Sequence, residues 1–256
     1  YKMAASSATG STLNIVPAST ARCELFLAIY DDSVQSVAST NKRHVVHCSG
    51  MYIGSISYTY PVDGSATESM TLVGNDKFWD NDSTAATGAI PVAPSTSYAD
   101  GLATALTGTD TPASGIVRRT GVNIAGCTIP ADIPNVGDNK GHIQSISVSA
   151  DFGRENILEL GTFGPYYRYA TFPFETTCEI ETVATQGDQV AVSGSAQNLQ
   201  ARTIIITDSA GTKLDLGTQN KLTSVSYTGG DTGGGNATVT FSYSTFNKLS
   251  VDGPGV

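Results

Sequence analysis

The sequence has few of the residues on which enzyme and nucleic-acid motifs depend. It contains three histidines, and its four cysteines form no C-x-x-C pair, which excludes the zinc and dithiol redox motifs recognised by cysteine spacing. Lys and Arg number 14 against 23 Asp and Glu, giving a formal net charge of -9. This balance argues against a strong DNA binder, because the phosphate neutralisation that drives nucleic-acid affinity has no obvious source in the sequence. The same acidity suits a protein that lets DNA pass without holding it.

Long hydrophobic runs are also missing. No stretch approaches 18 consecutive apolar residues, so we expect a soluble protein that contacts no membrane. Cys23 and Cys178 fall in step with neighbouring apolar residues, which indicates buried structural thiols. Disulfides among Cys23, Cys48, Cys127 and Cys178 remain the alternative, with three possible connectivities.

What the sequence does contain is β structure. Charged residues make up only 14% of the chain and glycines number 27, which favours short strands joined by turns over charged helices. An apolar run at 23–30 predicts a strand, here a central one. Alternation of apolar and polar residues predicts further strands at 51–60, 143–152 and 236–243, and residues 202–217 form a predicted hairpin. The chain is therefore predicted to be a single, mainly β domain spanning residues 1–256.

Two segments depart from that pattern. A short helix of about two turns is predicted over Arg154 to Leu160, with Ile157, Leu158 and Leu160 on its apolar side. Residues from about 80 to 140 are rich in Ser, Thr, Ala, Gly and Pro and far exceed an ordinary loop. We interpret them as a long excursion from the domain, such as an arm that reaches a neighbouring molecule.

The sequence contains no specific catalytic or metal-binding signature. His44 and His47 would point to opposite faces of a strand, and residues 80–91 lack the glycine and glutamate of a calcium loop. No G-x-S-x-G signature occurs, and the glycine run at 229–235 lacks the ending of a phosphate-binding loop. We therefore predict no catalytic residues, no metal site and no cofactor.

The segment 160–181, LGTFGPYYRYATFPFETTCEIE, concentrates aromatic and acidic side chains. Glu175, Glu179 and Glu181 alternate with apolar residues, so one strand would carry a buried face and an acidic one. A solvated strand face is the simplest reading of these carboxylates. The preceding Tyr166, Tyr167, Arg168 and Tyr169 are candidates for the core or for a subunit interface.

Segments 142–181 and 47–79 together resemble the tail tube proteins of tailed bacteriophages. That resemblance implies a β-sandwich or half-barrel with a small flanking helix, assembled as hexameric rings that stack into a genome conduit. Residues 154–160 would be the flanking helix, and strands at 51–60, 68–75, 143–152 and 173–183 would form the tube wall. The long excursion and the strands after residue 189 exceed a minimal tube protein.

The function implied is that of a non-enzymatic virion structural protein, located in the tail and assembled in the host cytoplasm. Its main partner would be itself, with tail sheath, terminator or baseplate proteins as further partners. Glu175, Glu179 and Glu181 would face the lumen, past which DNA moves without specific binding. The alternatives are a capsid-associated or decorating virion protein, and a secreted carbohydrate-binding β-sandwich or a hydrolase using scattered Asp and Glu.

Overall fold

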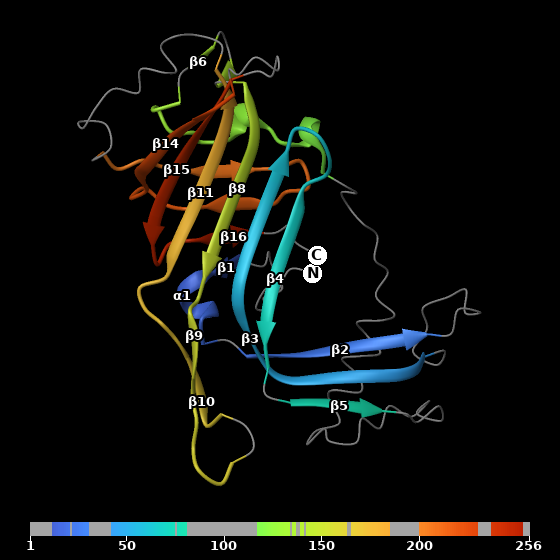
Figure 1. Ribbon diagram of the computed structural model, residues 1–256. Helices are drawn as coiled ribbons and strands as arrows, with labels where there is room; N and C mark the ends of the chain where they lie inside the picture. Colours follow the sequence, from blue (N-terminus) through green and yellow to red (C-terminus); the bar gives the residue numbers. More distant parts are fainter. Residues whose placement is uncertain are drawn as a thin grey trace.

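The computed structural model describes residues 12–20, 22–30, 42–74, 76–80, 117–133, 135–136, 139–140, 142–162, 165–184, 200–229 and 237–252. Most of these residues lie in antiparallel β-sheets (Figure 1). Within the described residues one α-helix occurs, the four-residue α1 (Ile15–Ala18). The predicted mainly β class is confirmed.

A large antiparallel sheet forms the body of the molecule. Its strands follow the order β14-β15-β11-β8-β3, and β4 pairs with the free side of β3. Their bounds are β3 Lys42–Pro61, β4 Thr67–Val73, β8 Ile143–Asp151, β11 Glu175–Val183, β14 Lys221–Thr228 and β15 Thr238–Phe246. The predicted strands at 51–60, 143–152 and 173–183 therefore lie side by side, as neighbours in one sheet.

Strand β3 is 20 residues long and serves two sheets. Its second half lies in the main sheet, whereas its first half bends away and pairs with β2 (Cys23–Tyr30) and β5 (Asp76–Asp80) as a projecting arm (Figure 1). Within the described residues β2 pairs only with β3. The expectation that 23–30 forms a central strand is therefore wrong, because its apolar run belongs to the arm and not to the sandwich.

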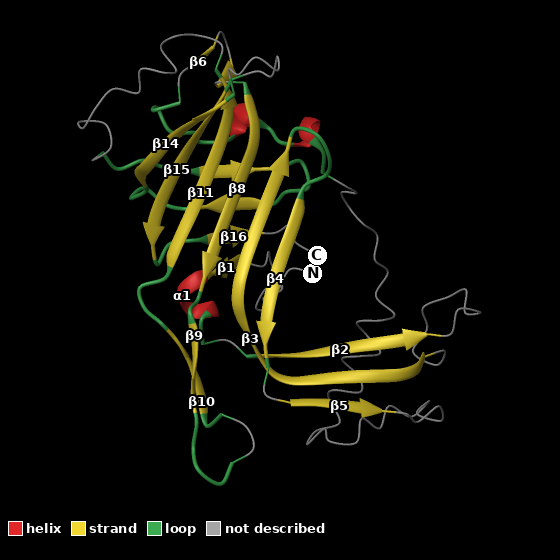
Figure 2. Cartoon of the chain, viewed as in Figure 1, coloured by secondary structure: helices red, strands yellow, loops and turns green. Residues whose placement is uncertain are grey.

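A smaller sheet of four strands crosses behind the main sheet (Figure 2). Its order is β1-β16-β13-β12, with bounds β1 Thr12–Asn14, β12 Ile205–Thr207, β13 Lys213–Asp215 and β16 Ser250–Asp252. Strands β12 and β13 are the predicted hairpin, and their turn lies at the predicted residues 208–211. The fold is thus a two-layer β-sandwich.

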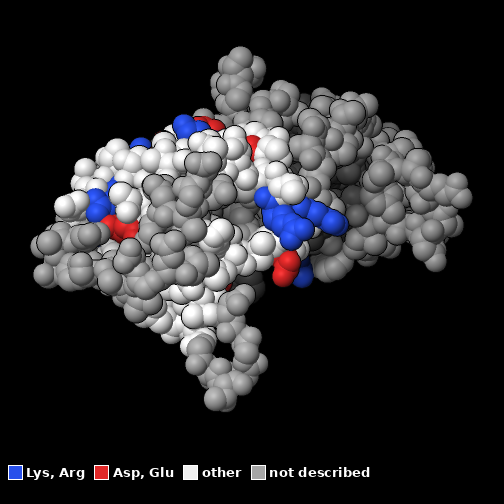
Figure 3. Space-filling view, turned by 90° about the horizontal axis from the view of Figure 1, so that it is seen from above, with Lys and Arg blue, Asp and Glu red and all other residues white. Residues whose placement is uncertain are grey.

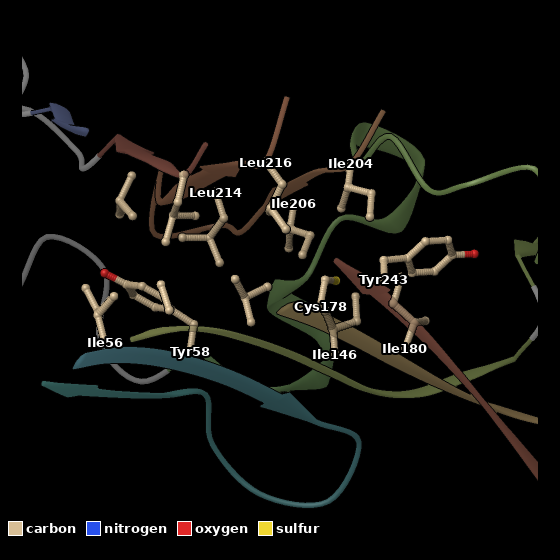
Figure 4. Packing of buried hydrophobic residues seen from close by; sticks show 14 of the residues in the cluster. Ile56, Tyr58, Ile146, Cys178, Ile180, Ile204, Ile206, Leu214, Leu216 and Tyr243 are labelled. Carbon is tan, nitrogen blue, oxygen red and sulfur yellow. The ribbon is translucent and has the colours of Figure 1, made fainter. Parts of the chain in front are cut away.

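The hydrophobic core lies between these two layers (Figure 4). Ile146 of β8 and Ile180 of β11 face Ile206 and Leu214 of the small sheet, and all four are buried. The alternation predicted for β8, β11 and β15 is confirmed, since the apolar positions of each strand point into this core.

Residues 117–133 close one end of the sandwich. They contain the short 3₁₀ turns η3 (Arg119–Gly121) and η4 (Ile124–Gly126), and they bring Ile129 and Ile133 into the core. The latter part of the predicted excursion is therefore packed structure. Residues 81–116, its first part, lie outside the described residues.

An ion pair between a buried carboxylate and a partly buried arginine joins this closing segment to the small sheet. Arg202 donates from Nε to Oδ2 of Asp132 at 2.6 Å and from Nη2 to Oδ1 at 2.5 Å. The Asp132 side chain is fully buried, and the Tyr243 hydroxyl lies 3.5 Å from its Oδ2. The hydrogen bond from Arg202 to this carboxylate raises the pKa of Arg202, and the two nitrogens meet the two oxygens in a bidentate arrangement.

The helix predicted over Arg154 to Leu160 is absent, and that prediction is wrong. Residues Arg154–Ile157 are a strand, β9, which pairs with β10 (Tyr167–Ala170) as a hairpin projecting beyond the main sheet (Figure 1). Two turns of apolar spacing are too short to favour a helix once a partner strand is within reach. Leu158 and Leu160 follow the strand in the hairpin loop, and Gly161 has a positive φ of 88° there instead of capping a helix.

The cysteines whose side chains the structure describes are free thiols and form no disulfides. Cys48, Cys127 and Cys178 are free, and Cys178 is completely buried in β11. Burial raises the pKa of the Cys178 thiol from 9.0 to about 12, with a smaller contribution from Glu179. The side chain of Cys23 lies outside the described residues.

This buried thiol should make the fold sensitive to alkali. Above pH 9 the unfolded chain releases the thiol proton while the folded chain retains it, so the folded state binds more protons and stability falls as pH rises towards 12. Above pH 9 the loss from this group approaches about 1.4 kcal/mol per pH unit. Urea unfolding of the wild type and of Cys178→Ala at pH 8 and pH 10 measures it. The variant should lose less stability between the two pH values, and an equal loss in both proteins contradicts the assignment.

Candidate functional surface

The outward face of the main sheet carries the predicted carboxylates. Glu175 and Glu179 of β11 are exposed and Glu181 is half-buried, whereas the alternate residues Thr176, Cys178 and Ile180 are buried. The sequence-based prediction of one acidic and one buried face on this strand is confirmed. Because β11 lies near the middle of the sheet, the carboxylates stand near its centre and not at an edge.

Small hydroxyl side chains surround these carboxylates. Glu179 is flanked across the sheet by Ser147 of β8 and Ser242 of β15, and Glu181 lies opposite Ser145 and Thr240 in the same way. The same face continues with Ser55, Ser57 and Thr59 on β3, Thr67, Ser69 and Thr71 on β4, and Ser224, Ser226 and Thr228 on β14. The main sheet therefore presents a broad surface of short hydroxyl groups with a central row of negative charge.

Hydrogen bonds hold two of the three carboxylates against this surface. The Ser244 hydroxyl donates to Glu175 Oε1 at 2.7 Å, and the Ser145 hydroxyl donates to Glu181 Oε2 at 3.2 Å. Lys221 at the edge is the one basic residue among the described outward positions of β4, β8, β11, β14, β15 and the part of β3 that pairs with β8. The surface is therefore acidic across its centre, and it offers no cluster of cations to phosphate.

The predicted aromatic cluster lies on the β9–β10 hairpin. Tyr166, Tyr167 and Tyr169 are 73%, 46% and 38% exposed, so none of the three belongs to the core of this chain. Tyr169 donates a hydrogen bond to Glu155 across the hairpin. Ile157, Leu158, Leu160 and Phe172 are also well exposed at this end of the molecule. Of the two roles considered for these residues, the core role is wrong for the three tyrosines.

Two arginines occupy the other side of the hairpin. Arg168 is buried, and neither its Nε nor its Nη1 has a hydrogen-bond partner among the described residues. Arg154 donates from Nε to the carbonyl oxygen of Ile53 at 2.8 Å, and its guanidinium lies 5.1 Å from the ring centre of Tyr52. Burial lowers the pKa of Arg154. These contacts attach the base of the hairpin to the main sheet.

A cleft that the sequence did not reveal lies at the opposite end of the main sheet. It has a volume of about 490 Å³ between the turn after β3 and the start of η3, and it is lined by Val62, Asp63, Gly64, Ser65, Arg118, Arg119 and Thr120. The N–H of Ala66 donates to the carbonyl oxygen of Val117 at 2.7 Å, which ties the two walls together. Viewed from this end, several Lys and Arg side chains lie together with an acidic side chain beside them, and further basic side chains are scattered over the same face (Figure 3).

A smaller hollow of about 70 Å³ adjoins this cleft. Its lining is mostly apolar and comes from Tyr60, Pro61, Val62, Val122, Ile124, Ile143 and Ile146, with Arg119 and Gln144 at its side. Arg119 therefore borders both the cleft and the hollow. Two residues distant in sequence, Pro61 and Ile124, meet here only because 117–133 folds over the end of the sheet.

No group of three or more His, Cys, Asp or Glu side chains that could hold a metal ion occurs among the described residues. The side chains of His44 and His47, and residues 81–91 of the considered calcium loop, lie outside the described part of the chain. None of the helices in the described segments is long and apolar enough to cross a membrane. No protein-family model matches the chain, and no curated protein matches it in sequence.

Proposed function

We propose that this chain is the tail tube subunit of a tailed bacteriophage, a structural protein whose copies assemble into stacked rings around a passage for DNA. The observation that carries the proposal is the outward face of the main sheet, where Glu175, Glu179 and Glu181 stand among short hydroxyl side chains. The resemblance of segments 47–79 and 142–181 to tail tube proteins supports the same reading.

Such a surface suits the movement of DNA along it without binding. The central carboxylates repel the phosphates of DNA. The hydroxyl groups stay hydrated and do not bind the phosphate backbone tightly as arginine does. In the central strands β8 and β11, the described outward positions hold no aromatic side chain on which a base could stack. DNA would therefore pass this face without specific binding.

The edges of the main sheet favour self-association. Within the described residues β14 pairs only with β15, and β4 pairs only with β3. Open edges of a long sheet are ready to pair with another chain. If β14 of one copy meets β4 of the next, closure into a ring pairs both edges and turns one sheet face towards a common centre.

The exposed apolar side chains of the β9–β10 hairpin also favour an assembled state. Leu160, Leu158 and Tyr166 are fully or largely exposed in the single chain. Exposed apolar groups that gather at one place are typical of surfaces covered by a partner. That partner would be a second copy in the tube, or a sheath, terminator or baseplate protein at its surface or its ends.

The assembly state of the purified chain tests this proposal. Sedimentation velocity and negative-stain microscopy should show rings or tubes of uniform diameter with a central passage, forming more readily as protein concentration rises. A chain that stays monomeric over the whole accessible concentration range contradicts the proposal. Binding on a glycan array or a measurable hydrolytic turnover would instead support the carbohydrate-binding or hydrolase alternative.

A further inference from the structure

We infer that the β9–β10 hairpin of one copy docks on the end cleft of the next copy, so that copies join head to tail along the tube axis. The inference rests on the proposed tail tube function and identifies the contact between successive rings. It is carried by the chemistry of the two surfaces, which complement each other and lie at opposite ends of the same chain.

The hairpin supplies apolar and acidic groups together. Leu158 and Leu160 are 76% and 102% exposed, and the exposed Glu159 lies between them in the chain. Glu155, also exposed, accepts a hydrogen bond from Tyr169, which holds its carboxylate beside an aromatic ring. This end of the molecule therefore presents apolar side chains, whose burial is favourable, beside carboxylates that can pair with a cation on a partner.

The cleft supplies the complementary groups. Arg118 and Arg119 are exposed, and Arg119 lies between the polar cleft and the small apolar hollow. A leucine side chain entering the hollow would place a neighbouring carboxylate near a guanidinium. Arginine binds carboxylates through two parallel hydrogen bonds, a geometry that sets register as well as affinity.

The positions of the two surfaces determine the kind of assembly. The hairpin projects beyond one end of the main sheet, and the turn after β3 with η3 lies at the other end (Figure 1). A contact between unlike surfaces on opposite ends is heterologous and does not close on itself in one step. Repetition of this contact therefore builds an open stack of copies.

A second copy fits the cleft better than a free anion. Asp63 lines the same cleft and repels phosphate and carboxylate alike, so charge alone does not select the occupant. The adjoining apolar hollow does select it, because it contributes nothing to binding an inorganic anion but accommodates a hydrocarbon group such as a leucine side chain. The net charge of -9 makes carboxylates the commonest charged groups that another copy can offer to Arg118 and Arg119.

Charge reversal tests the contact. Glu159→Lys and Arg119→Glu should each leave the fold and the lateral contacts intact while weakening end-to-end association roughly tenfold or more, because like charges then meet. An equimolar mixture of the two variants, and the double variant, should recover it, since opposite charges meet again. Lys248→Glu reverses an exposed charge between β15 and β16 and should have no effect. Sedimentation velocity and microscopy measure association, and circular dichroism confirms folding.

The outcomes separate this inference from the proposed function. Rings that stack equally well in both single variants overturn the docking contact and leave the tube function standing. Failure of the mixture and of the double variant to restore stacking, with all proteins folded, overturns it too. If rings never form, the tube function is contradicted. The docking contact can still be tested, because single copies should then associate end to end in the mixture of the two variants but not in either variant alone.

Discussion

Replacing Asp132 by alanine is expected to lower the free energy of unfolding by about 2–4 kcal/mol, because two charge-assisted hydrogen bonds to the partly buried Arg202 guanidinium are lost. The Asp132 side chain is completely buried, and Arg202 contacts both of its carboxylate oxygens. The substitution leaves the Arg202 guanidinium without its carboxylate partner, and it weakens the attachment of segment 117–133 to the small sheet. Urea-induced unfolding followed by circular dichroism measures the change.

The paired replacement is the matched control. Asp132→Leu combined with Arg202→Met removes both charges together, so it should cost less than Asp132→Ala, because no charge is left without its partner. A loss below about 1 kcal/mol for Asp132→Ala would show that the pair does not hold the segment in place. Loss of the ion pair should also disturb the end cleft, since Arg118 and Arg119 belong to the same closing segment.

The triple variant Glu175→Lys, Glu179→Lys and Glu181→Lys is expected to convert a sheet face that repels DNA into one that binds it. Three lysines on one strand face would each neutralise a phosphate, and affinity should then fall with salt at a slope of roughly -0.9 per contact. For three contacts, raising the salt from about 50 to about 200 mM should weaken binding about 40-fold. Fluorescence anisotropy with duplex DNA measures this, and the wild-type chain should show no binding.

The corresponding glutamine variants provide the control. Glu→Gln at the same three positions keeps the side-chain shape and removes the charge, so DNA affinity should stay near that of the wild type. If the lysine variant assembles normally and also fails to bind DNA, the outward face of β11 does not face a passage for DNA. If the wild type itself binds duplex DNA strongly, the repulsive role of these carboxylates is contradicted.

The main sheet could be predicted from the sequence because its pattern is local. Ile146 and Val148 alternate with serines on β8, and Cys178 and Ile180 alternate with glutamates on β11, so each strand reveals its buried face without knowledge of its neighbours. The tight turn at residues 208–211 likewise marks its own hairpin. The acidic face of β11 was predictable for the same reason.

What could not be predicted depends on contacts between distant segments. Nothing near Asp132 in the sequence points to Arg202, and the cleft requires Asp63 and Arg119 to meet across a chain reversal. The hydroxyl surface is made by strand register, because Ser147 and Ser242 flank Glu179 only after three strands have paired. The hairpin was mistaken for a helix because Ile157, Leu158 and Leu160 match helical spacing, whereas pairing with Tyr167 decides the outcome.

A cryo-electron microscopy reconstruction of the assembled chain is the most direct measurement of where the outward face of the main sheet lies. We expect it to show a closed ring in which Glu175, Glu179 and Glu181 of every copy, with the serines beside them, line a central passage. An assembly that carries these carboxylates on its outer surface, or buries them between copies away from any passage, would contradict the account.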